Sequence, residues 1–199
     1  REVKMGDDDI VEDSFRILVS TDNHLGYCER DPIRGNDSFA TFKEVLEIAA
    51  SENVDMILLG GDLFHENKPS KHSLVRCMEL FRSFTFGDKP VLFDYVSDPL
   101  EDFKYSTNPN VNYLDPNFNV SIPVFSIHGN HDDPTGLGQF CALDVLSSAG
   151  YVNYFGRTSD LKNISVSPLL FMKGSTKLAI YGLSSVKDER LHRLFLEEK

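Results

Sequence analysis

The stretch that decides the fold of this 199-residue chain runs Val54-Asp55-Met56-Ile57-Leu58-Leu59-Gly60-Gly61-Asp62. Its apolar part has the length and composition of a buried strand, and the two glycines allow a sharp turn before the carboxylate of Asp62. A second buried strand is predicted at residues 15–20, and apolar residues at helical spacing between Phe39 and Ala49 predict a connecting helix. This order of strand, helix and strand predicts an α/β fold with parallel strands.

The rest of the chain continues the alternation of helices and strands with one interruption. A helix is predicted after Ser70, a third buried strand at residues 122–127 and a helix near residues 139–148. Between the first two of these, residues 86–119 are rich in proline and asparagine, so we expect a long inserted loop there. Two strands, at 164–172 and 177–181, and a closing helix at 188–196 complete the expected sheets and helices.

The composition is that of a folded protein. Hydrophobic residues make up 41% and charged residues 26%, which excludes a disordered or collagen-like chain. Its apolar runs are far shorter than the roughly 18–20 residues of a membrane span, so we expect no membrane association. The net charge of −11 argues against coating nucleic acid by bulk charge, but it is compatible with phosphate binding through metal ions.

The cysteines and the N-terminus indicate a reducing compartment. Cys28, Cys77 and Cys141 are far apart and form no C-x-x-C pair, which argues against a disulfide framework and favours the cytosol or nucleus. Residues 1–13 are acidic and lack the apolar segment of a secretory signal. We therefore expect a flexible acidic tail at 1–13 and one folded domain at 14–199.

Residues with metal-binding chemistry follow three of the predicted strands. Asp22 and His24 follow the first strand, Asp62 the second, and Asn130 and His131 the third. Since the carboxyl ends of parallel strands meet at one edge of a sheet, we expect these side chains to converge. Oxygen ligands with imidazole suit Mn²⁺, with Mg²⁺ or Fe as alternatives. A pair of ions about 3.5–4 Å apart needs a bridging carboxylate, for which Asp62 is the natural residue.

Each of these motifs is weak evidence when it is taken alone. A D-x-H triplet is common on protein surfaces, and Gly-Asp after a strand is commonly only a turn. All three motifs at successive strand ends, in this order, rarely arise by chance. The third one adds a histidine, His131, next to Asn130, where an imidazole can protonate a leaving oxygen.

This order of motifs resembles the first half of the signature of the calcineurin-like metallophosphoesterases. The residues around the motifs, 20–27, 61–70 and 125–134, are similar to the branch of eukaryotic double-strand-break repair nucleases that is related to bacterial SbcD. The resemblance covers residues 14–199. It implies an α/β sandwich of mixed β-sheets flanked by helices, incomplete at the C-terminus.

The same resemblance implies an activity and roles for the motif residues. Asp22, His24 and Asp62 would hold a first Mn²⁺, Asp62 and Asn130 a second, and His131 would be the catalytic histidine. The family hydrolyses DNA phosphodiesters, as a 3′–5′ exonuclease on duplexes and an endonuclease on single strands. This activity serves double-strand-break repair and meiotic recombination in the nucleus.

One departure from the family pattern affects the expected activity. The family completes its metal sites with a later Gly-His pair and a Gly-His-x-His sequence, and neither occurs in this chain. The other histidines, including His65 and His128, are not expected to be ligands. The first ion then keeps three ligands and the second two. We interpret the chain as an N-terminal part of the nuclease domain and expect little or no cleavage by it alone.

The resemblance also implies partners. The helices near 71–84 and 139–148 would form a homodimer interface, the loop at 86–119 would bind nibrin, and the nuclease would bind DNA and an SMC-like coiled-coil ATPase. The residues alone leave open whether the apolar stripe of the first helix is an interface or simply core; it comprises Leu74, Cys77, Met78, Phe81 and Phe84.

Two other functions are compatible with the sequence. The chain could be a catalytically incomplete dimerisation and nibrin-docking module. It could also belong to another calcineurin-like phosphatase, but such enzymes place an arginine soon after the second motif, and residues 63–67 contain none.

Overall fold

A parallel β-sheet forms the centre of the molecule. The computed structural model describes residues 13–106, 109–158, 160, 162 and 164–197. Four parallel strands lie in the order β1 (Ile17–Ser20), β2 (Met56–Leu59), β4 (Val124–Ser126) and β5 (Asn153–Tyr154). The predicted acidic tail at 1–13 lies outside the described residues except for Asp13. The side chain of Asp13 accepts a hydrogen bond from the backbone of Ser175 at 2.6 Å.

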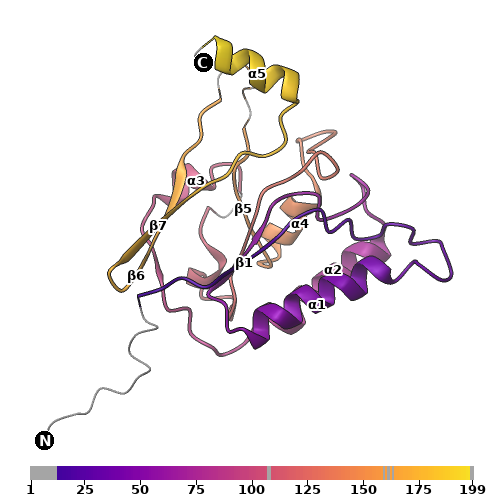
Figure 1. Cartoon of the computed structure of the whole chain (residues 1–199), viewed down its shortest axis with the longest axis horizontal. Coiled ribbons are helices and arrows are strands. Elements are labelled where there is room, and N and C mark those ends of the chain that lie inside the picture. The colour runs from indigo at the N-terminus through magenta and orange to yellow at the C-terminus, as the bar shows by residue number, and fades with distance from the viewer. Residues whose placement is uncertain (1–12, 107–108, 159, 161, 163, 198–199) are drawn as a thin grey trace, which may run out of the picture.

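A second, antiparallel sheet packs against one face of the first (Figure 1). It has the strand order β3 (Asp94–Tyr95), β6 (Pro168–Lys173) and β7 (Thr176–Tyr181). Aromatic rings fill the space between the sheets, with the centroids of Phe125 and Phe171 5.1 Å apart. The buried residues of this cluster are Met56, Phe93, Phe103, Val111, Phe125, Phe155, Leu169 and Phe171. The predicted α/β sandwich is confirmed.

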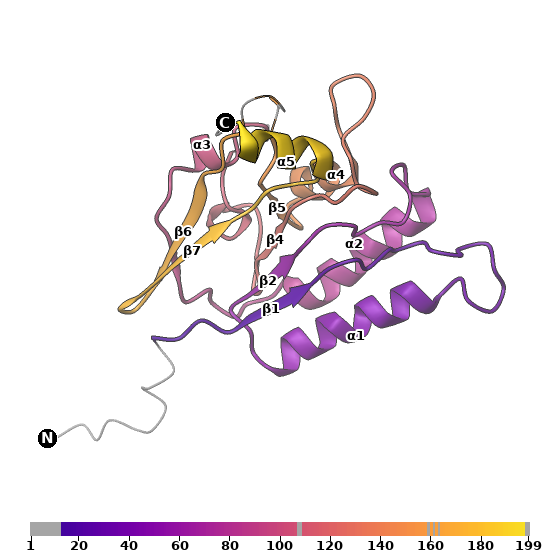
Figure 2. The ribbon, with the colours of Figure 1, turned by 45° about the horizontal axis from the view of Figure 1, so that its top comes forward.

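Helices cover the other face of the parallel sheet (Figure 2). They are α1 (Asp37–Ser51), α2 (Lys71–Thr85) and α4 (Ala142–Ser148), and α1 and α2 lie side by side. The Ser70 side chain caps α2 by accepting a hydrogen bond from the backbone of Ser73. Because helices cover one face of the sheet and the second sheet covers the other, the central strand β2 is apolar on both faces: Ile57 and Leu59 lie in the helix-side cluster and Met56 in the cluster between the sheets.

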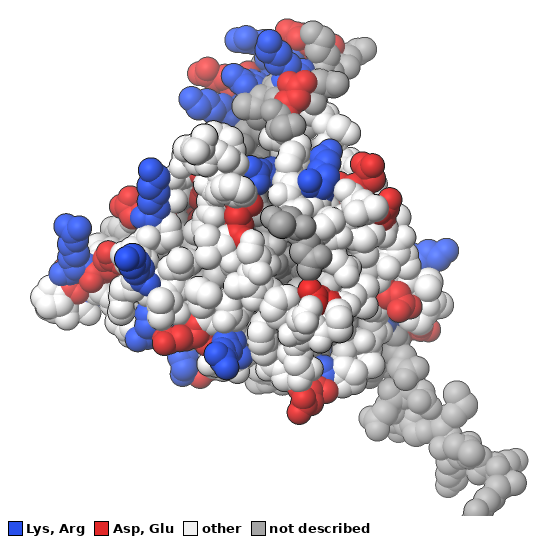
Figure 3. Space-filling view, turned by 180° about the vertical axis from the view of Figure 1, so that it is seen from behind, with Lys and Arg blue, Asp and Glu red and all other residues white. Residues whose placement is uncertain are grey.

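A last helix, α5 (Asp188–Leu196), projects from one end of the molecule. Figure 3 shows that Lys and Arg side chains gather on it, interleaved with acidic ones. Only Leu194 of this helix is buried, whereas Phe195 and Leu196 are exposed. No helix among the described residues is long and apolar enough to cross a membrane.

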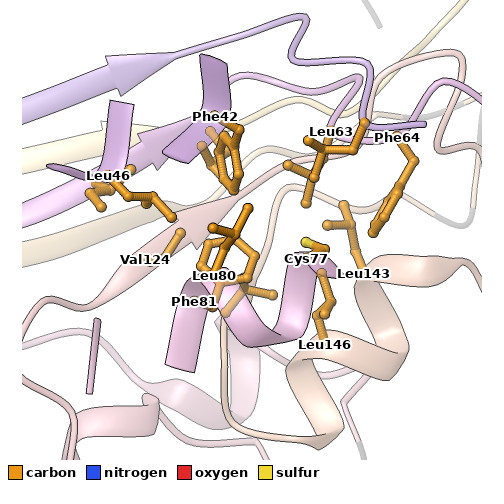
Figure 4. Packing of buried hydrophobic residues seen from close by; sticks show 14 of the residues in the cluster. Phe42, Leu46, Leu63, Phe64, Cys77, Leu80, Phe81, Val124, Leu143 and Leu146 are labelled. Atoms are coloured by element: carbon orange, nitrogen blue, oxygen red, sulfur yellow. The ribbon is translucent and has the colours of Figure 1, made fainter. Parts of the chain in front are cut away.

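Two residues of the predicted apolar stripe of α2, Cys77 and Phe81, lie in the hydrophobic cluster that Figure 4 shows. Cys77 and Phe81 are fully buried there. The other stripe residues, Leu74, Met78 and Phe84, are partly buried and pack against the same cluster. Core packing therefore accounts for the stripe, while Val75, which is 51% exposed, lies outside it. The homodimer interface remains a prediction.

The segment at 86–119 is less loop-like than the sequence suggested. It contains β3, a short helix α3 (Pro99–Asp102) and a 3₁₀ helix at Asn112–Leu114. Phe93 is buried between the two sheets, which explains part of the apolar character of residues 91–96. Leu92 and Val96 are exposed. Binding of a partner by this segment remains a prediction.

Candidate metal centre

The loops that leave β1, β2 and β4 meet at the carboxyl edge of the parallel sheet. The pairing of β1 with β2 continues past both strands, because the backbone N–H groups of Asp22 and His24 donate to the carbonyls of Gly61 and Asp62 at 3.1 and 3.0 Å. The third loop joins through His131, whose backbone N–H donates to Oδ1 of Asp62 at 2.8 Å. The structure therefore brings four of the five predicted site residues together around Asp62.

Two glycines make this close approach possible. A Cβ on Gly61, which has φ +108°, would lie 2.8 Å from the backbone nitrogen of Gly129. A Cβ on Gly129 would lie 2.0 Å from Oδ1 of Asp62. Any side chain at either position would push the two loops apart.

Three of the predicted ligands have a left-handed backbone. Asp22, His24 and Asp62 have φ values of 55°, 46° and 51°. Such a conformation is unfavourable for residues other than glycine, by about 1 kcal/mol or more each, and persists only where the surrounding structure enforces it. Strain of this kind concentrates at functional sites.

Asp22, His24 and Asp62 form a group that fits a divalent ion. Their ligand atoms all lie within 4.8 Å of one another. Ligands at about 2.0–2.2 Å on opposite sides of one ion are separated by about 4 Å, so a small closure of this group would complete the coordination. Nδ1 of His24 is buried and has no hydrogen-bond partner among the described residues. A donor set of two carboxylates and an imidazole is suited to Mn²⁺ and similar ions.

A second group was not predicted from the sequence, because it includes His65. The imidazoles of His24, His65 and His131 also offer ligand atoms within 4.8 Å of one another. The rings of His65 and His131 are stacked with centroids 5.2 Å apart. The backbone bridge between Leu25 and Phe64 places His65 beside His24, so its position follows from how far the β1–β2 pairing extends.

The carbonyl of His65 also orients His131. Nδ1 of His131 lies 2.6 Å from this oxygen. A carbonyl oxygen can only accept, so Nδ1 carries the proton and donates it to this bond. Nε2 of His131 is then the ring nitrogen that can face a substrate.

Comparison with known proteins identifies the family to which this arrangement belongs. The family model described as calcineurin-like phosphoesterase matches residues 15–199. The chain belongs to the calcineurin-like phosphoesterases. This confirms the resemblance drawn from the three strand-end motifs and makes the protein a member of a family of metal-dependent hydrolases.

Within the calcineurin-like phosphoesterases, the chain is similar to double-strand break repair proteins. It is 59% identical over 188 residues to the double-strand break repair protein MRE11 of Mus musculus, which is 94% of this chain and 27% of that protein. The identity to the Homo sapiens protein of the same name is 57% over 188 residues, and the coverage is the same. For the Arabidopsis thaliana MRE11 it is 52% over 187 residues, or 92% of this chain and 26% of that protein. The chain thus spans about a quarter of the length of these relatives.

The fifth predicted residue, Asn130, lies on the same loop as His131. Its side chain is exposed, and it follows Gly129, whose backbone is in close contact with Asp62. The structure thus places Asn130 next to the other site residues of this phosphoesterase. Its assignment to a second ion remains a prediction.

Asp132 is a further residue that the sequence did not single out. Its buried carboxylate accepts hydrogen bonds from the backbone N–H groups of Leu63 at 2.8 Å and Phe64 at 3.0 Å. Burial raises the pKa of this carboxyl group, and the backbone donors counteract part of the rise. Asp132 therefore fastens the loop after β4 to the segment that follows Asp62. Only its position after the Gly-Asn-His triplet could have drawn attention to it.

Proposed function

We propose that this protein is a Mn²⁺-dependent DNA nuclease of double-strand-break repair and meiotic recombination. We assign it 3′–5′ exonuclease activity on duplexes and endonuclease activity on single strands, and we place it in the nucleus. The observation that carries this proposal is the convergence of Asp22, His24 and Asp62, with His131 bonded to Asp62. The similarity to relatives named for double-strand break repair supports DNA as the substrate.

The site residues divide into ligands and a proton donor. We propose that Asp22, His24 and Asp62 hold one ion and that Asp62 and Asn130 contribute to a second. Divalent ions at such a site supply charge neutralisation for the phosphodiester and lower the pKa of bound water. The role we assign to His131 is to protonate the leaving oxygen from Nε2, because Nδ1 is held by the carbonyl of His65.

The proposal includes limits for the activity of this chain alone. The Gly-His pair and the Gly-His-x-His sequence of the family do not occur in it. We therefore expect it to bind the first ion more tightly than the second and to cleave DNA poorly. We also propose that the complete protein forms a homodimer through α2 and α4 and binds an SMC-like coiled-coil ATPase, with nibrin bound through residues 86–119.

Metal titration tests the proposal directly. We expect the chain to bind about one equivalent of Mn²⁺ in calorimetry, and we expect Asp62→Ala to abolish this binding. Cleavage of a 3′-recessed duplex is measured alongside, with little or no product expected from either protein. No Mn²⁺ binding by the unmodified chain would contradict the metal site. Strong cleavage that Asp62→Ala abolishes would support the nuclease and contradict the proposed limit on this chain.

A further inference from the structure

A cationic groove lies on the far side of the loop that carries Asn130 and His131. It encloses about 400 Å³. Three cations line it, namely Arg157 after β5 and Lys187 and Arg190 at the start of α5. Its lining also includes the polar residues Thr158, Ser184 and Ser185, together with other residues of the loops. We call this feature the β5 groove.

The β5 groove is connected to the metal centre through the backbone. On one side of the loop after β4, His131 donates to Asp62. On the other side, the backbone N–H of Ser185 donates to the carbonyl of His128 at 3.0 Å. Since β4 and β5 are neighbouring parallel strands, the β5 groove lies one strand further along the same sheet edge, about 5 Å per strand.

The charge of the β5 groove is opposite to that of the whole chain. Among the described lining residues Asp133 is the one carboxylate, and its Oδ1 lies 3.4 Å from Nε2 of His128. The guanidinium of Arg157 is held in place by Asp144 at 3.1 Å and by the ring of Tyr105 at 5.2 Å. Lys187 and Arg190 are exposed. In a chain with a net charge of −11, this local excess of cations favours an anionic ligand.

We propose that the β5 groove binds a backbone phosphate of the nucleic acid that the metal centre cleaves. The proposal rests on the nuclease function proposed above. Arg, Lys and hydroxyl side chains are the usual partners of DNA phosphates, and such contacts fix the register of the strand without reading its sequence. A DNA strand that passes the metal centre along this edge of the sheet reaches the β5 groove at the end of the neighbouring β-strand, β5. By holding one phosphate of the DNA backbone, the groove fixes which other phosphate lies at the metal centre.

DNA binding without metal tests the proposal. The variant is Lys187→Gln with Arg190→Gln, because both side chains are exposed and their removal spares the ion pair of Arg157. The matched control is Lys89→Gln with Lys177→Gln, which removes the same charge from exposed positions outside the β5 groove. Fluorescence anisotropy of a labelled 3′-recessed duplex is followed in EDTA between about 50 and 200 mM salt.

We expect the groove variant to bind about tenfold more weakly at low salt. Its slope of log K against log salt should be shallower by about 1, since the groove is proposed to bind one phosphate and each phosphate contact contributes about 1. The control should change affinity by less than about twofold. Equal changes in both double variants would overturn the proposal and leave the nuclease intact. If the unmodified chain bound Mn²⁺ but no duplex, both the groove and the proposed DNA substrate would fail.

Discussion

The strand β2 has an aspartate beyond each end, and the two carboxylates differ in how many hydrogen bonds they accept from the protein. Asp55, before the strand, accepts from Nζ of Lys173 at 2.6 Å with one oxygen and from the backbone N–H of Arg16 at 2.7 Å with the other. Asp62, after the strand, has a left-handed backbone, and its carboxylate accepts one hydrogen bond within the described residues, from the backbone N–H of His131. A carboxylate with both oxygens bound by the protein is structural. One that is strained and keeps bonding capacity can bind a ligand.

The largest expected effect is a loss of Mn²⁺ affinity when Asp62, at the carboxyl end of β2, is changed. Asp62→Asn should weaken Mn²⁺ binding by about 100-fold or more, because it removes the charge shared by the ligand group. Stability should change by less than about 1 kcal/mol, since the amide oxygen can still accept from His131 and Asn tolerates a left-handed backbone. Calorimetric titration and urea unfolding measure the two effects.

The control for this change is Asp55→Asn at the other end of the strand. It should leave Mn²⁺ affinity unaltered while it lowers the midpoint of urea unfolding. If both variants lost metal binding alike, the distinction between a structural and a functional end of β2 would be wrong.

A smaller effect, on the free energy of unfolding, is expected when the ion pair between Lys173 and Asp55 is broken. The side chains of Lys173 and Asp55 are 7% and 11% exposed. Lys173→Met leaves the carboxylate of Asp55 buried without its partner and should lower the free energy of unfolding by about 2–3 kcal/mol. Combining it with Asp55→Asn should recover part of this loss, because neither charge is then left alone. Additive losses in urea unfolding would show that the two side chains do not act as a pair.

The smallest expected effect is a pH dependence at the metal end. Burial lowers the pKa of His128 to about 4, so its imidazole is neutral in the folded protein near pH 7. Below about pH 6.5 the unfolded chain takes up a proton that the folded chain resists, so stability falls as the pH approaches 4. We expect this residue to cost about 1 kcal/mol of stability between about pH 7.5 and 5.5.

His128→Asn isolates this contribution, because its amide oxygen can still accept from the hydroxyl of Tyr154, which lies 2.5 Å from Nδ1 of His128. Urea unfolding in EDTA at the two pH values compares the variant with the unmodified chain. The same pH dependence in both proteins would mean that His128 is not the group responsible.

Much of the fold could be predicted because it depends on local patterns. The order of strands and helices followed from apolar spacing, and the last helix begins and ends where the sequence placed it, at Asp188–Leu196. The second strand was predicted from Val54 but begins at Met56. Asp55 instead bonds to Lys173, 118 residues away, and such a contact leaves no local signal.

The candidate site could be predicted in part for the same reason. The residues directly after the strands were found because the sheet edge brings them together. His65 was set aside as a ligand and Asp132 was given no role, because their positions depend on how two loops pair beyond the strands and on backbone donors that carry no sequence signature. The apolar run at 91–96 was ambiguous, since burial of Phe93 against a strand more than 70 residues later cannot be read from its neighbours.

The last helix, α5, is attached to the body of the molecule by hydrogen bonds of the segment that precedes it. The helix is about 13 Å long and projects from the body, and the segment before it is tied by Ser184 to the carbonyl of Gly156 and by Ser185 to that of His128. The hydroxyl of Ser184 also accepts from the backbone N–H of His128 at 3.3 Å, so three hydrogen bonds attach this segment and two of them end on the loop that carries His131. A displacement of α5 is therefore passed to the loop that carries the metal edge through hydrogen bonds that lie outside the parallel sheet.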